Sequence, residues 1–181
     1  MKIHFSKKGM GVGEVFVYII AALTFALIMI FGYKAINQFL EKGQQVELVQ
    51  FKTELESSVK KIYSEYGSVR EVRYRLPSGY TQVCFVDLDK RYNPNCNTLP
   101  LTDPVACTVW KQAQESAGEV KYDNADENVF LTPPAPVKIK VYKINIPGGI
   151  LCIPLTQSSF SLRLEGEGDK TALQIPPPPG Q

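Results

Sequence analysis

Residues 15–33, near the N-terminus, contain no charged side chain and read VFVYIIAALTFALIMIFGY. At about 1.5 Å per residue, a helix of this length covers close to the ~30 Å hydrocarbon core of a bilayer. Three lysines precede the segment, at Lys2, Lys7 and Lys8, and basic residues at one end of such a helix stay in the cytoplasm. The sequence therefore predicts one membrane-spanning helix with a cytoplasmic N-terminus and an extracytoplasmic domain after it.

A cleaved secretory signal peptide is the first alternative for this segment. Such a peptide has a shorter apolar region, which ends at a cleavage site made of small residues. Here the apolar segment ends in Phe31-Gly32-Tyr33-Lys34, a poor site of that kind, and a helical pattern continues directly beyond it. A plain signal anchor, which would keep its N-terminus, stays open as an interpretation.

The residues just before the apolar segment help to distinguish between these interpretations of it. Lys7-Lys8-Gly9, then Met10, then Glu14 at the fifth position after Gly9, resemble the leader of type IV prepilins. In that family a short basic leader ends in glycine, and its signal peptidase cuts on the cytoplasmic side of the apolar helix, which stays in the product. The resemblance implies cleavage by a prepilin peptidase between Gly9 and Met10.

The start of the mature chain differs in two respects from that of most bacterial pilins. Met10 occupies a position where those proteins usually have phenylalanine, and Gly11 and Gly13 weaken the first helical turn. Archaeal pilins and archaellins vary more at these positions, and the chain looks more like them; a secretion pseudopilin also fits. The resemblance covers about the first third of the chain.

Glu14 is the charged residue at the entrance of the apolar segment. A charged carboxylate inside lipid is costly and needs a partner. In the pilin family this glutamate faces the terminal amine of a neighbouring subunit, so the resemblance implies that Glu14 meets the amine of Met10 of the next copy during assembly. A plainer interpretation also stays open, in which Glu14 lies in the headgroup layer and its charge is favoured by the first turn of a helix.

The only histidine is His4, within the leader. The body of the chain therefore lacks an imidazole, which excludes serine–histidine and cysteine–histidine nucleophile systems and histidine metal ligands there. Hydrophobic residues make up 44% of the chain, enough for a packed core, and a net charge of +2 is too small to suggest nucleic-acid binding. We expect no enzymatic activity and no bound metal or cofactor.

All four cysteines follow the apolar segment. Outside the cytoplasm, two disulfides are the default state of four cysteines, and three pairings are compatible with the sequence. We expect Cys96–Cys107, which would close the loop before a short helix, and Cys84–Cys152, which would tie two strands together. Reduced, buried thiols are the alternative.

Beyond Lys34, apolar residues recur at spacings of three and four, as on one face of an amphipathic helix. The sequence predicts that one helix runs from about Glu14 to Tyr66, with Gly67 at its end and Gly43 as its weakest point. A β-rich domain packed against the second half would cover its apolar stripe.

After Gly67 the pattern changes to the alternation of strands. The sequence predicts a hairpin of residues 72–76 and 81–88 around a Pro77-Ser78-Gly79 turn, and a short helix from Asp103-Pro104 to about Ala117. Further strands are expected at residues 129–131, 137–146 with a bulge near Tyr142, 150–155, 160–165 and 172–175, the last two joined by an acidic turn.

The expected fold class is α+β, with a long N-terminal helix packed on an antiparallel β-sheet head. We expect a leader at residues 1–9, an assembly helix at 10–34, an amphipathic stem at 35–67, a head at 68–175 and a polyproline tail at 176–181. The expected function is that of a pilin-like structural subunit of a surface filament or pseudopilus, whose partners are other pilin subunits. The alternative is an uncleaved, membrane-anchored binding or adhesion module.

Overall fold

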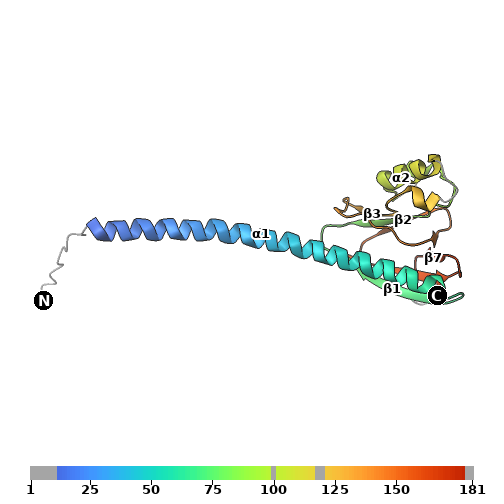
Figure 1. Ribbon diagram of the computed structural model, residues 1–181, viewed down its shortest axis with the longest axis horizontal. Coiled ribbons are helices and arrows are strands. Elements are labelled where there is room, and N and C mark those ends of the chain that lie inside the picture. Colours follow the sequence, from blue (N-terminus) through green and yellow to red (C-terminus); the bar gives the residue numbers. More distant parts are fainter. Residues whose placement is uncertain (1–11, 99–100, 117–120, 178–181) are drawn as a thin grey trace. The chain divides into compact units, whose positions relative to one another are not determined.

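The computed structural model describes residues 12–98, 101–116 and 121–177. The chain divides into two compact units, Met1–Gly43 and Gln44–Gln181. One helix, α1 (Val12–Tyr63), belongs to both of them and is drawn in Figure 1. Its limits are close to the predicted residues 14 and 66, and the chain leaves it through Gly67, whose positive φ of 75° favours glycine.

The second unit contains the rest of the described elements, which form two sheets and one further α-helix. A four-stranded sheet has the order β1-β6-β7-β4, and a three-stranded sheet has the order β3-β2-β5. All pairs are antiparallel except β4 with β7, which is parallel. The fold is thus α+β, as expected. The elements after α1 are β1 (Val69–Arg75), β2 (Gln82–Val86), η1 (Cys96–Thr98), α2 (Pro104–Glu115), η2 (Lys121–Asn124), β3 (Val129–Thr132), β4 (Ile144–Asn145), β5 (Ile150–Pro154), β6 (Ser159–Gly166) and β7 (Thr171–Gln174).

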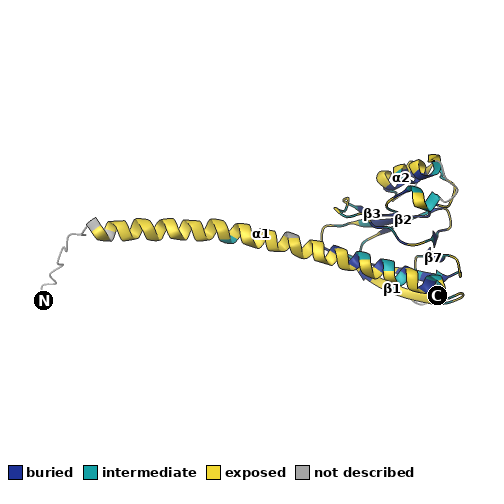
Figure 2. Cartoon of the chain, in the orientation of Figure 1, coloured by how far each residue is buried: buried dark blue, intermediate teal, exposed yellow. Residues whose placement is uncertain are grey.

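The second half of α1 supplies one wall of the main core. Its inward-facing residues recur at spacings of three and four, which places them on one stripe of the helix. Figure 2 shows this change along α1, from an exposed first part to a partly buried second part. The buried stripe consists of Leu48, Phe51, Leu55, Val59 and Ile62.

Strand β2 separates two apolar cores. Val83 and Phe85 belong to the core that contains the α1 stripe, whereas Cys84 and Val86 belong to the core around Trp110 of α2. This arrangement follows from the alternation of side chains along a strand. It explains why β2 is apolar on both of its faces, and it agrees with the position of α2 in Figure 1.

The predicted hairpin of residues 72–76 and 81–88 is wrong. β1 pairs with β6, and β2 pairs with β3 and β5, so the two strands lie in different sheets. The physical reason is burial: β1 exposes most of its residues at the edge of its sheet, whereas β2 needs a partner on each side and cover on both faces. The Pro77-Ser78-Gly79 segment therefore carries the chain from one sheet to the other.

The strand predicted over residues 137–146 is also wrong in most of its length. Only β4 and an isolated bridge between Ile139 and Val129 are present. The side chain of Asn128 makes the hydrogen bonds that a neighbouring strand would make. Its Oδ1 accepts a hydrogen bond from the Val141 N–H at 2.8 Å, and its Nδ2 donates to the Val141 carbonyl at 3.1 Å. A buried amide thus satisfies a backbone segment that the sequence pattern assigns to a sheet.

Replacement of Asn128 with alanine is expected to lower the free energy of unfolding of the head by roughly 3 kcal/mol. The buried N–H and C=O groups of Val141 would both lose their partner, at a cost of about 1–3 kcal/mol each when a group stays unsatisfied. Urea unfolding followed by the fluorescence of Trp110, the single and fully buried tryptophan, measures this loss. Exposed Asn97 replaced with alanine is the control, and equal midpoints for the two variants would contradict the expectation.

The start of α2 is as predicted. The Oδ1 atom of Asp103 accepts hydrogen bonds from the N–H groups of Val105, at 2.7 Å, and Ala106, at 3.3 Å, and Pro104 is the first helical residue. Aspartate before a proline is a typical helix start, because the cap satisfies free N–H groups and proline has none to satisfy. The expected stop at Gly118 lies outside the described residues.

Candidate functional site

The predicted processing residues Lys7, Lys8, Gly9 and Met10 lie outside the described residues. Glu14 belongs to the first turn of α1, which begins at Val12, and the structure describes only its backbone. The predicted assembly residue is therefore on the helix, ahead of the apolar segment, and stays a prediction.

The apolar part of α1 is uncovered. Each described residue from 15 to 33 is exposed except Gly32, which is half-buried. The large side chains among them, such as Phe16, Tyr18 and Phe31, keep 64–69% of their surface open. By length and composition this helix can cross a membrane. A continuous apolar surface of this kind needs lipid or another protein around it.

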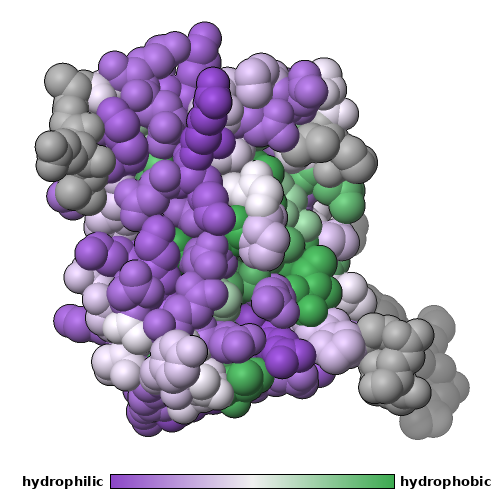
Figure 3. Space-filling model, turned by 90° about the vertical axis from the view of Figure 1, so that its right-hand side faces the viewer, coloured by the Kyte–Doolittle hydropathy of each residue, from purple (hydrophilic) through white to green (hydrophobic). Residues whose placement is uncertain are grey.

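The surface of the head has a different character. Figure 3 shows one face, on which hydrophilic side chains predominate around a smaller apolar area. The outward residues of the edge strand β1 include Arg73 and Arg75, both exposed. Charged side chains on an edge strand discourage pairing with another sheet. The long continuous apolar surface of residues 15–33 thus contrasts with the mainly hydrophilic face of the head in Figure 3.

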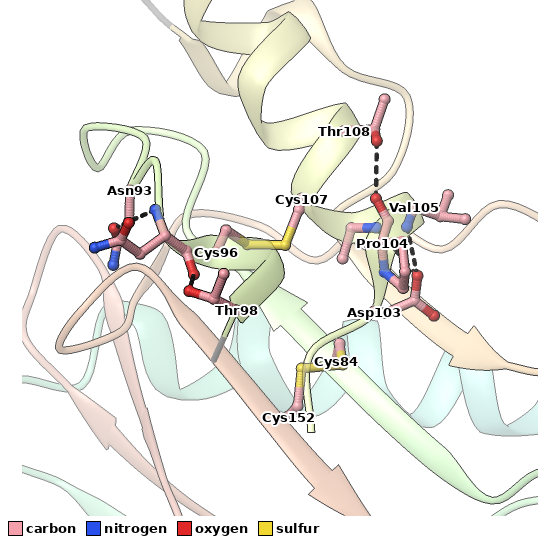
Figure 4. The surroundings of a disulfide bond; sticks show 12 residues. Cys84, Asn93, Cys96, Thr98, Asp103, Pro104, Val105, Cys107, Thr108 and Cys152 are labelled. Carbon is pink, nitrogen blue, oxygen red and sulfur yellow. Dashed lines mark hydrogen bonds between the residues drawn. A yellow bond between two sulfur atoms is a disulfide. The ribbon is translucent and has the colours of Figure 1, made fainter. Parts of the chain in front are cut away.

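Two disulfides fasten the core around α2 (Figure 4). Cys84 and Cys152 are directly opposite one another on β2 and β5, and Cys96 of η1 is joined to Cys107 of α2. This is the pairing expected from the sequence. Disulfides persist in oxidising compartments, so the two bonds are typical of a domain outside a reducing cytoplasm.

A buried carboxylate in the head has a structural explanation. Asp87, only 1% exposed, accepts hydrogen bonds from the N–H groups of Asp89 and Ile146 and so ties the end of β2 to the segment before β5. Burial raises the pKa of Asp87, and the positive charge of Lys170 opposes this rise. Among the described residues, no group of three or more His, Cys, Asp or Glu side chains is placed to hold a metal ion.

A groove of about 630 Å³ opens on the head beside the end of α1. Three of its residues are tyrosines, which come from α1, from η2 and from the segment before β4. The groove is half polar, with two lysines and a glutamate among its walls. We call it the tyrosine groove, and its residues are Glu56, Lys60, Tyr63, Ser64, Tyr122, Lys140 and Tyr142.

The three tyrosine rings form a row with Tyr142 in its middle. The ring centre of Tyr142 lies 5.0 Å from that of Tyr63 and 6.1 Å from that of Tyr122, with edge-to-face geometry in both pairs. The Lys140 ammonium lies 4.0 Å from the centre of the Tyr122 ring. Such contacts hold aromatic rings in fixed orientations.

Sequence reasoning did not find this groove. Tyr63 falls within the helix predicted from about Glu14 to Tyr66, and Tyr142 lies at the predicted bulge. Tyr63 and Tyr122 are 59 positions apart and Tyr122 and Tyr142 are 20 positions apart, and no local motif connects them. The only local signal is the phase change of the pattern near Tyr142, from which the sequence predicts a bulge.

The chain was compared with family models, with curated proteins and with solved structures, and none of them matches it.

Proposed function

We propose that this protein is a pilin-like structural subunit, cleaved between Gly9 and Met10 and assembled through α1 into a cell-surface filament or secretion pseudopilus. The observation that carries the proposal is the continuity of α1. One helix exposes an apolar surface over residues 15–33 and then supplies the buried stripe of the head. A subunit that is inserted in the membrane and later packed by the same helix needs this arrangement.

The chemistry of assembly follows from the first turn of α1. Cleavage after Gly9 creates an amine on Met10, four residues before Glu14 in the sequence. Neither charge is stable alone within apolar surroundings, and the pair formed between neighbouring copies neutralises both. Because a misaligned copy would leave both charges unpaired, the contact also selects one register among helices that are otherwise held by apolar packing.

Two features of the chain support one orientation of the protein in the membrane. Lysines before α1 favour a cytoplasmic N-terminus, and the two disulfides favour an extracytoplasmic head. The two arguments are independent, and both support an extracytoplasmic head.

An uncleaved, anchored binding module is the second candidate function. The tyrosine groove favours it, because an open groove with aromatic and charged walls is suited to bind a ligand. In that case α1 would serve as an anchor and stalk, and Glu14 would have no partner in another copy.

The intact mass and N-terminal sequence of the protein purified from its native membrane separate the two candidates. We expect Met10 as the first residue, and a chain that retains Met1 would support the anchor instead. Gly9 replaced with leucine should block processing, since the leader of this family ends in glycine. Gly11 replaced with alanine, two residues further on, is the matched control and should be processed normally.

A further inference from the structure

We propose that the tyrosine groove binds the proline-rich tail, residues 176–181, of a second copy of this chain. The tail reads PPPPGQ and follows directly after β7 and Ile175. As a contact between subunits the proposal rests on the proposed assembly, but binding of the tail to the groove does not depend on α1.

A run of prolines is a sequence that aromatic grooves recognise. Consecutive prolines adopt the polyproline II helix, because the ring fixes φ and removes the N–H donor. This helix loses little conformational entropy on binding, and it docks in grooves lined by aromatic rings. Tyr63, Tyr142 and Tyr122 form such a row on the head, with Tyr142 exposed at its centre.

The groove also offers the hydrogen-bond donors that the prolines of the tail lack. A polyproline II helix leaves its carbonyl oxygens free to accept hydrogen bonds. Within the described part of the chain, neither the phenol oxygens of the three tyrosines nor the Lys60 ammonium form a hydrogen bond or ion pair. Burial, followed by the charge of Asp123, raises the pKa of Tyr122, so its hydroxyl is a donor at neutral pH.

The charges beside the groove do not require a charged occupant. The tail contains no charged side chain, and the groove has both signs, from Glu56, Lys60 and Lys140. A neutral ligand leaves these charges solvated at the rim. Binding of the tail should therefore depend little on salt, in contrast with an ionic ligand.

The strand order indicates that the tail reaches another copy. β4 and β7 are parallel, with Ile144 opposite Thr171, so Tyr142 lies near the start of β7. The tail leaves the other end, beyond Gln174, which is opposite Arg163 of β6. At about 3.3 Å per residue, Pro176 is roughly 15 Å farther along, and a run of prolines does not reverse direction over so short a distance. We therefore expect the tail to bind the groove of a neighbouring copy and not the groove of its own chain.

A labelled synthetic peptide, LQIPPPPGQ, tests the proposal. It is titrated into the full chain in detergent micelles, and binding is followed by fluorescence anisotropy. We expect saturable binding that changes little between low and high salt. Tyr142 replaced with alanine should weaken it about tenfold, the loss expected for an aromatic contact at the centre of a site. Tyr66, which is 84% exposed and outside the groove, is the matched alanine control and should bind normally.

Two further measurements keep the test decisive. Tyr142 replaced with phenylalanine keeps the ring and should retain most of the binding, and Trp110 fluorescence verifies that each variant is folded. The proposal is overturned if the peptide does not bind, if LQIAAAAGQ binds equally well, or if the alanine variant at Tyr142 binds as tightly as the wild type. A groove that binds an oligosaccharide and not the peptide would also overturn it. None of these results affects the mass of the processed chain, so this proposal and the proposed function fail separately.

Discussion

Replacement of Glu14 with alanine is expected to abolish filament formation while the head stays folded. Glu14 has the only charged side chain between Lys8 and Lys34, and the proposed register depends on its pairing with the amine of Met10 in the next copy. Without it, that amine would remain unpaired in an apolar environment, which is strongly unfavourable. The head does not contribute to this contact, since its core begins at Leu48.

The measurement is the amount of sedimentable filament sheared from cells that express each variant, together with electron microscopy. Glu14 replaced with glutamine should also fail, because the amide keeps the shape and loses the charge. Exposed Glu47, in the second half of the same helix, gives the matched control when it is replaced with alanine. Normal filaments from the alanine variant at Glu14 would rule out the proposed role of its carboxylate.

A side chain at Gly166 is expected to unfold or severely destabilise the head. A Cβ atom at this position would lie 2.3 Å from the carbonyl oxygens of both Glu65 and Ile62. These are backbone atoms, held in place because the Gly166 carbonyl accepts from the Gly67 N–H and the Gly166 N–H donates to the Ser68 carbonyl. Neither the chain at the end of α1 nor strand β6 can move away without the loss of these hydrogen bonds or of the contact between them. We expect a loss of roughly 3 kcal/mol for alanine, with a greater loss for valine.

Urea unfolding followed by Trp110 fluorescence measures this effect on the full chain in detergent. Gly43 is a suitable control, because a Cβ atom there meets nothing within 4 Å and the residue lies inside α1. Alanine at Gly43 should leave the head unchanged, since alanine is the better helix former. An alanine variant at Gly166 as stable as this control would show that the end of α1 and β6 are not in the close contact described.

Local chemistry made much of the fold predictable from the sequence. The apolar residues of α1 keep one helical period as far as Ile62, and Asp103 with Pro104 marks the start of α2. These signals depend on residues that are neighbours in the chain. The hairpin of β6 and β7 was predictable for the same reason, because its acidic turn lies between two alternating segments.

The wrong predictions concern residues whose partners are distant in the chain. Alternation indicates which residues of β1 and β2 are buried, but it does not say which strand pairs with them. The segment before β4 was misassigned because the amide of Asn128 replaces a strand, which no periodicity reveals. The tyrosine groove was missed for the same reason, since Tyr63, Tyr122 and Tyr142 meet only in the folded head.

The continuity of α1 into the head core also determines how tension would pass through this molecule. A pull on the N-terminal segment reaches the head through the stripe from Leu48 to Ile62, so the load is spread as shear along several turns of helix. Both disulfides lie in the other core, around α2, and the side chain of Cys84 is on the face of β2 that is turned away from that stripe. The covalent bonds therefore fasten the core to which, among the described residues, α1 contributes no buried side chain.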